Sequence, residues 1–261
     1  MRYKYLILIA FFIVSIKIRS QVPIIATAWK DQVTSYEELV AIDKNDFLQY
    51  DFSSIFSNYN RFKGDPWSSY VGVFGPKNTR IEFHLQAIRS TDETYQIKGF
   101  SKLGKNIRSL EGLFKIKSFF KSKNREIYFM LFEYNLKEPG DRNGDGYFTG
   151  IGSIVFQVSD DDDNTVNIFW ATSGELRKYN NVFAGTWNRY NSKVSRECVF
   201  SFSPTGFAQL PFREYFYKEF EEDDECKCNY DIKEEFMKYG WEDYYGGSKD
   251  DWWYDLEIFF E

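Results

Sequence analysis

Residues 141–146 carry the pattern in this sequence that comes nearest to a metal site. The run Asp141-Arg142-Asn143-Gly144-Asp145-Gly146 has oxygen-bearing side chains at positions 1, 3 and 5 and glycine at position 6. In calcium loops these oxygens converge on the cation and the glycine permits a sharp turn. Position 12 is Gly152 instead of Glu, and strands instead of helices are predicted on both sides. Two interpretations therefore stand: a calcium site of Asp141, Asn143 and Asp145, or a polar hairpin turn without metal.

The three cysteines, Cys198, Cys226 and Cys228, suggest a disulfide. In an exported protein two thiols are expected to pair and one to be left over. A bridge from Cys198 to either of the others would attach the C-terminal segment to the strands before it, and it requires Cα atoms within about 7 Å. Zinc is not expected, because the one histidine, His84, lies far away in sequence and four ligands are not in sight.

Catalytic patterns are sparse in this chain. A Ser-His-Asp triad would have to use His84, and the sequence has no Gly-x-Ser-x-Gly turn, phosphate loop or dinucleotide motif. Glycoside hydrolysis needs only two suitably placed carboxylates, and a chain with 39 acidic residues does not exclude such a pair. The acidic run 160–163 is interpreted as a solvated hairpin tip that could also attract a cation. The sequence therefore favours a protein without catalytic activity.

Aromatic side chains are the remaining candidates for a binding site. Tyr128, Tyr134, Trp170 and Trp187 lie on predicted strands. Their flat rings could stack on sugars or line an apolar cavity, and packing in the core is the alternative. Aromatic residues make up 20% of the chain, so that a sizeable core can be built from them.

The segment from Tyr70 to Phe202 must supply the elements that position these residues. Runs of aromatic and β-branched residues alternate there with turn signals at 75–78, 90–93, 103–106, 121–124, 139–146, 160–164 and 190–192. This spacing predicts a mainly β fold: an antiparallel up-and-down barrel, or a two-sheet sandwich, of about eight or nine strands with short N- and C-terminal helices.

Three shorter patterns add detail. Apolar and polar residues alternate over 81–87, which turns His84 away from the core. The run 127–132 is apolar on both faces, so a helix near residue 36 or the C-terminal segment is expected to cover its outer side. A capping box predicts a helix over 35–42, a second helix is expected over 231–240, and the apolar segment 46–60 is expected to lie across a barrel mouth or an edge.

The first twenty residues resemble an export signal. Arg2 and Lys4 precede an apolar stretch from Leu6 to Ile16, which is too short to cross a bilayer as a helix. We expect a protein exported to the periplasm, cell surface or medium, without stable membrane insertion after cleavage at residue 20; an uncleaved N-terminal anchor is the alternative. The remaining chain then divides into a lead-in segment (21–68), the barrel (69–204) and an acidic aromatic segment (205–261).

Charge argues against nucleic acid as a partner. The net charge is −6, and residues 213–261 hold 17 acidic residues against six Lys or Arg. Binding to phosphates requires a cationic footprint, which neither the acidic segment nor the nearly neutral remainder supplies.

The run Val182-Phe183-Ala184-Gly185-Thr186-Trp187 resembles the Gly-x-Trp strand of lipocalin-like and avidin-like barrels. Uncharacterised exported bacterial proteins have a similar order, in which a Tyr-x-Gly strand (here 70–72) and a Glu-Pro-Gly-Asp turn (here 138–141) precede such a strand. The resemblance implies a small closed barrel with a binding role. The motif lies on the first strand in lipocalins and avidins and late in this chain, so no ligand-binding residue carries over.

The sequence thus predicts an exported, non-catalytic, lipocalin-like binding protein for a small molecule, a glycan or a partner. Two alternatives remain: a secreted carbohydrate-active enzyme or carbohydrate-binding module, and a structural or interaction protein that acts through its acidic aromatic tail. No cofactor is expected apart from the calcium considered above.

Overall fold

The computed structural model describes residues 24–58, 69–159, 165–169, 181–202, 217–219, 230–242, 244 and 252–256. The first elements are α1 (Ile24–Thr34), β1 (Leu39–Ile42), the 3-10 turn η1 (Lys44–Asp46) and α2 (Ser53–Phe56). The main strands are β2 (Tyr70–Phe74), β3 (Thr79–Arg89), β4 (Thr94–Leu103), β5 (Asn106–Ser122), β6 (Tyr128–Lys137), β7 (Gly146–Val158), β8 (Val166–Ile168), β9 (Val182–Arg189) and β10 (Ser195–Ser201). The last elements are β11 (Tyr217–Glu219), β12 (Tyr230–Ile232), α5 (Glu234–Phe236) and the π-helical turn η3 (Met237–Trp241).

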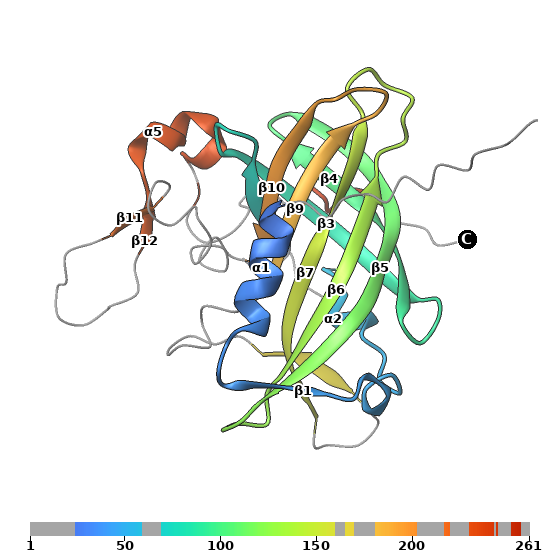
Figure 1. Ribbon diagram of the computed structural model, residues 1–261. Coiled ribbons are helices and arrows are strands. Elements are labelled where there is room, and N and C mark those ends of the chain that lie inside the picture. Colours follow the sequence, from blue (N-terminus) through green and yellow to red (C-terminus); the bar gives the residue numbers. More distant parts are fainter. Residues whose placement is uncertain are drawn as a thin grey trace, which may run out of the picture.

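Eight of these strands close into a barrel (Figure 1). Strands β2 to β7, β9 and β10 pair antiparallel in chain order, and β10 returns to pair with β2. The short strands β1 and β8 add to β5 and β7 and bring the sheet to ten strands. The predicted up-and-down barrel is therefore confirmed, and its closure leaves the ring without open edges.

The predicted turns fall between strands wherever the structure describes them, and 160–164 lies outside the described residues. In the meander, the turns at 75–78, 104–105, 138–145 and 190–194 share one end of the barrel. We call this the upper end, because the β6–β7 and β9–β10 hairpins project there in Figure 1. The turns at 90–93 and 123–127 lie at the lower end.

Glycines allow the strands to coil closely where β7 meets β9. Gly150 and Gly185 are register partners. A Cβ on Gly185 would lie 2.1 Å from the carbonyl oxygen of Thr149, and one on Gly150 would lie 2.2 Å from that of Ala184. No other residue fits these two positions without moving the backbone, so they fix the curvature of this wall.

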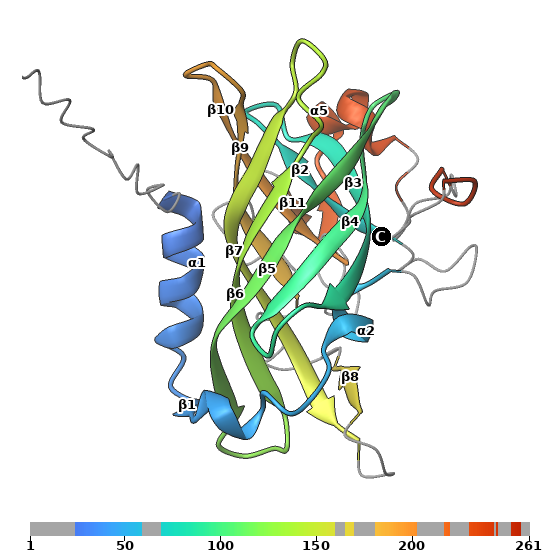
Figure 2. The same ribbon diagram turned by 90° about the vertical axis from the view of Figure 1, so that its right-hand side faces the viewer.

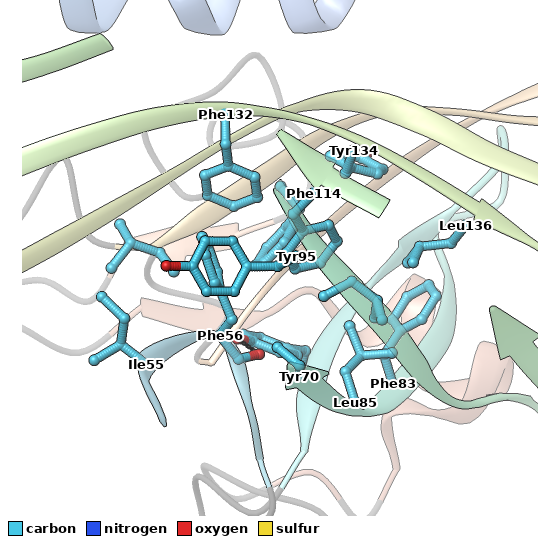
Figure 3. Close-up of a cluster of buried hydrophobic side chains, with 14 of the residues drawn as sticks. Ile55, Phe56, Tyr70, Phe83, Leu85, Tyr95, Phe114, Phe132, Tyr134 and Leu136 are labelled. Atoms are coloured by element: carbon cyan, nitrogen blue, oxygen red, sulfur yellow. Dashed lines mark hydrogen bonds between the residues drawn. The ribbon is translucent and has the colours of Figure 1, made fainter. Parts of the chain in front are cut away.

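Aromatic rings fill the interior of the barrel. Phe183 stacks on Phe200 with ring centroids 4.4 Å apart, and Phe83 stacks on the same ring at 4.1 Å. Figure 3 shows side chains from several strands, among them those of Phe114 and Phe132, pointing toward one another. Each of these rings is fully buried. This packing is a solid core of the kind that stabilises proteins by burial and dispersion contacts.

The segment that contains η1 and α2 closes the lower mouth, as the sequence predicted for 46–60 as far as the structure describes it. Phe52 and Phe56 are fully buried, and the ring of Phe56 lies 4.9 Å from that of Tyr95. Asn58 accepts a hydrogen bond from the amide of Leu85 at 2.9 Å through its side chain and donates to the carbonyl of Leu85 at 2.8 Å through its own amide. The plug is thus anchored to β3 by both packing and hydrogen bonds.

A second core lies outside the barrel, beneath helix α1. Ala26, Trp29 and Val33 share one helical face and are fully buried against a wall that includes Phe129 and Leu131 of β6. Figure 2 shows α1 along this wall. The prediction that the strand with two apolar faces needs an outer cover is confirmed, and the cover is α1 instead of a helix near residue 36 (Figure 2).

The predicted helix over 35–42 is wrong. The amide of Ser35 donates to the carbonyl of Asp31 at 2.9 Å, so this residue ends α1 instead of starting a helix. Leu39–Ile42 forms β1, which pairs with Phe119–Ser122 of β5. Pairing with an existing strand outweighs the local capping preference, which is a weak determinant of structure.

The predicted C-terminal helix is present but shorter than expected. Only Glu234–Phe236 is α-helical, and the chain then widens into η3. Gly240 has a φ of 96°, which ends the helix at the predicted glycine. The indole of Trp241 donates to the carbonyl of Asn78 at 2.7 Å, so this part of the segment is attached to the β2–β3 turn.

Candidate functional site

The predicted aromatic candidates are core residues where the structure describes them. Tyr134 is 2% exposed and Trp187 is 9% exposed. Tyr128 is half-buried at the lower end, where its ring stacks on Phe156 and its hydroxyl donates to Glu126 at 2.8 Å. Trp170 lies outside the described residues. Tyr134 and Trp187 therefore occupy the packed interior, and Tyr128 packs at its lower end.

A buried group of charges lies at the upper end, at the base of the β6–β7 hairpin. Glu138 is 4% exposed and Asp145 is 1% exposed. Arg108 Nε lies 2.9 Å from Asp145 Oδ1 without the alignment of a hydrogen bond, and Arg108 Nη1 lies 3.7 Å from Glu138 Oε1. One arginine thus faces two carboxylates inside the barrel mouth, a grouping that sequence reasoning missed because it depends on the strand register.

The carboxylate of Glu138 joins two strands. Its Oε2 accepts hydrogen bonds from the amide of Gly146 at 2.6 Å and from the indole of Trp187 at 3.1 Å. Burial raises the pKa of Glu138, against the lowering effects of the two hydrogen bonds and of Arg108. Because both donors point at one oxygen, this carboxylate orients the Trp187 ring and ties the start of β7 to the end of β6.

The calcium candidates are arranged as a hairpin turn. Asp145 Oδ2 accepts hydrogen bonds from the amides of Gly140 and Arg142, both at 3.1 Å. Asn143 Oδ1 accepts a hydrogen bond from Arg189 of β9, and Asp141 is exposed. Among the residues that the structure describes, no group of three His, Cys, Asp or Glu side chains is placed to hold a metal. Calcium at this loop stays a prediction, and the oxygens of Asp145 already have partners within the chain.

Cys198 lies inside the barrel. Its thiol is free and fully buried in the barrel interior, and burial raises its pKa well above the usual value. Cys198 faces inward because it alternates with Val199, which faces the outer core. Cys226 and Cys228 lie outside the described residues, so the pairing of the cysteines stays a prediction.

His84 does point away from the barrel interior, as predicted, but it is covered. The ring of Trp253 stacks on it with centroids 4.4 Å apart and planes 4° apart, and His84 is 4% exposed. Two positions along β3, Glu82 accepts a hydrogen bond from the indole of Trp252 at 2.7 Å and pairs with Arg80 at 2.6 Å. Trp252 and Trp253 of the acidic aromatic segment thus pack on the outer face of β3.

A shallow groove of about 390 Å³ lies on the outer wall over β4, β5 and β6. Two rows of register partners line its walls: Gln96, Leu113 and Asn135, and Lys98, Glu111 and Lys137. Ile97 and Gly112 lie between the rows, and because both occupy inward-facing positions of their strands, they contribute only backbone to the floor of the groove. The alternation of residues along each strand predicts which side chains face outward, but only the strand register brings these six side chains together.

Comparisons with protein-family models, with curated proteins and with solved structures gave no match.

No helix within the described ranges is both long and apolar enough to span a bilayer.

Proposed function

We propose that this protein is an exported, non-catalytic binding protein with a lipocalin-like barrel that takes its ligand on the outer wall and not in the interior. The packed interior is the observation that carries this proposal. Where a lipocalin-type barrel would enclose a ligand, the rings of Phe114, Phe132 and Phe183 lie 5.1 to 5.6 Å from one another. A ligand as large as a fatty acid would have to displace several of these rings.

The groove over β4–β6 offers the chemistry for a polar ligand. Gln96 and Asn135 supply amide donors and acceptors, and Lys98, Glu111 and Lys137 supply charged ones. Leu113 is 49% exposed between them and gives an apolar patch. Hydroxyl groups around an apolar ring face are what a sugar presents, so a short glycan is the ligand class that fits this surface best.

The buried carboxylates at the upper end favour a non-catalytic protein over a glycosidase. Glu138 and Asp145 both accept hydrogen bonds from backbone amides, and both face the guanidinium of Arg108. Glycoside hydrolysis needs an acid and a base or nucleophile that face the substrate on an open surface. These two groups are almost fully buried and serve the turn instead.

Titration calorimetry of the mature chain with neutral oligosaccharides tests the proposal. The probes are cello-, manno- and chito-oligosaccharides of about four to six units. The double variant Leu113→Ala, Asn135→Ala is expected to lower the affinity for the bound sugar on the order of tenfold, since it removes an apolar contact and a hydrogen-bonding amide.

The matched control is Ile88→Ala with Asn167→Ala, which removes an exposed apolar side chain of β3 and an exposed amide of β8 outside the groove. It should leave the affinity unchanged. Equal losses in both variants would place binding elsewhere, and failure of every oligosaccharide to bind would reject the glycan ligand.

A further inference from the structure

The upper end of the barrel carries exposed cations that the groove does not use. Lys105, Arg142, Lys193 and Arg196 lie in or beside three different hairpin turns and are exposed. None of these four, which we call the rim cations, forms an ion pair with a described residue. The exposed acids in the same turns are Asp141 and Glu197. The rim therefore has an excess of positive charge in a chain whose net charge is −6.

Contacts between hairpins fix the rim in place. Arg108 of β5 faces Asp145 of the β6–β7 turn at 2.9 Å. Tyr190 of the β9–β10 turn donates through its hydroxyl to the carbonyl of Glu138 at 2.9 Å and through its amide to the carbonyl of Asp145 at 3.1 Å. The amide of Gly75 in the β2–β3 turn donates to the carbonyl of Glu197 at 2.8 Å. Strand β5 and the β6–β7 and β9–β10 turns are thus connected, and the β2–β3 turn is bonded to β10, so the rim cations are presented on a preorganised surface.

The buried carboxylates explain why the rim stays cationic. Glu138 and Asp145 face inward, where they compensate Arg108 and accept amide hydrogen bonds. They are 4% and 1% exposed, so they add little negative charge to the surface of the rim. Of the acidic residues in the β6–β7 turn, Asp141 is therefore the one that is exposed.

Sugar-binding groups lie among the cations. The half-buried rings of Tyr147 and Tyr190 have centroids 5.9 Å apart, and Gly140, which has no side chain, lies beside the Tyr190 ring. Asn143 and Asn191 add exposed amides in the same two turns. Cations bind carboxylates or sulfates, tyrosine rings contact sugar faces, and amides bind hydroxyls.

We infer that the upper rim binds an acidic polysaccharide. A polysaccharide fits better than an anionic membrane because the exposed large apolar residue in these turns is Val194, at 38%, and insertion into a bilayer requires larger apolar anchors. This surface is distinct from the groove, and its residues do not overlap with Leu113 or Asn135.

The experiment measures binding of the mature chain to alginate, a polymer of uronic acids, by biolayer interferometry. The buffer contains ~0.15 M salt, which screens charges of the acidic C-terminal segment that lie more than about 8 Å from the rim. The quadruple variant Lys105→Gln, Arg142→Gln, Lys193→Gln, Arg196→Gln should bind on the order of tenfold or more weakly, because it removes four charge contacts. Raising the salt to ~1 M should release the wild-type protein.

The matched control changes the same number of charges lower on the barrel: Lys115→Gln, Lys117→Gln, Lys123→Gln, Arg125→Gln, all exposed. It should bind alginate within about twofold of wild type. Equal weakening in both variants, absence of alginate binding, or equal binding to neutral dextran overturns the inference. So does binding through the rim cations to phosphatidylglycerol vesicles or to DNA in preference to alginate. Loss of sugar binding in the groove variant leaves these readings unaffected, so the two proposals fail separately.

Discussion

At the scale of single residues, the hydroxyl of Tyr134 is an unpaired polar group in the barrel interior. It is fully buried, has no hydrogen-bond partner and lies 2.5 Å from the position that a Cβ on Gly185 would take. Burial raises its pKa well above the usual value. The hydroxyl therefore loses its hydration on folding without gaining a bond in return.

Tyr134→Phe should accordingly stabilise the protein by about 1 kcal/mol in urea denaturation, because the ring stays and only the unpaired hydroxyl leaves. Tyr70→Phe is the matched comparison, since the Tyr70 hydroxyl donates to the carbonyl of Phe56 at 3.1 Å. That change should destabilise by about 1 kcal/mol. Equal destabilisation by the two substitutions would mean that the Tyr134 hydroxyl has a partner in solution.

Glu138 gives a prediction about pH. Its pKa is raised in the folded state, mainly by burial, so the folded protein binds this proton more tightly than the unfolded chain does. The stability that this group contributes is present below the ordinary carboxyl pKa and is lost as pH rises through the raised value. In Glu138→Gln the position stays neutral, so the stability of the variant relative to wild type should improve as pH rises.

Denaturation curves for both proteins from about pH 4 to pH 7.5 measure this difference. Asp141→Asn is the control, since Asp141 is exposed in the same turn. The opposite result is that Glu138→Gln becomes less stable relative to wild type as pH rises. It would show that Arg108 and the hydrogen bonds lower the pKa of Glu138 more than burial raises it.

At the scale of elements, α1 depends on one tryptophan. Trp29 is fully buried between the helix and the barrel, and its indole donates to Ser153 Oγ at 3.1 Å. Trp29→Ala should cost about 3–5 kcal/mol of unfolding free energy, because it leaves a large cavity. Lys30→Ala, an exposed neighbour on the helix, should change stability by less than about 0.5 kcal/mol. A small effect of Trp29→Ala would mean that α1 is not docked.

The C-terminal segment makes a second prediction at this scale. His84 is the one histidine in the chain and lies beneath the ring of Trp253. Trp253→Ala should raise the rate at which diethyl pyrocarbonate modifies His84 several-fold, because the imidazole becomes exposed. Tyr254→Ala removes a ring that is 57% exposed and should leave the rate unchanged. Fast modification in the wild type would contradict the packing of this segment on β3.

Much of the element order could be predicted from the sequence, because turn residues and alternation are local signals. The capping box at Ser35 failed, since nothing local reveals that Leu39–Ile42 meets a strand eighty residues later. The same limit applies to the site. The sequence places Tyr134 and Trp187 on strands, but the grouping of Arg108 with Glu138 and Asp145 follows from the register of β5, β6 and β7.

At the scale of the whole molecule, the barrel is a filled body whose outer wall is covered in part. Aromatic rings fill its interior, the segment of η1 and α2 closes the lower mouth, and the buried charge group lies at the upper mouth. The outer face beneath α1 is a second core, which makes the wall two layers thick there. A closed β-barrel of this kind can present grooves and turns with little change of shape on binding.

Diffraction from crystals of the protein pressurised with xenon tests the filled interior most directly, because xenon enters apolar cavities that water leaves empty. The account predicts no xenon inside the ring of β2–β7, β9 and β10 in the wild type, and a xenon site beside the missing ring in Phe183→Ala. A xenon atom or an apolar ligand inside the wild-type barrel would contradict it.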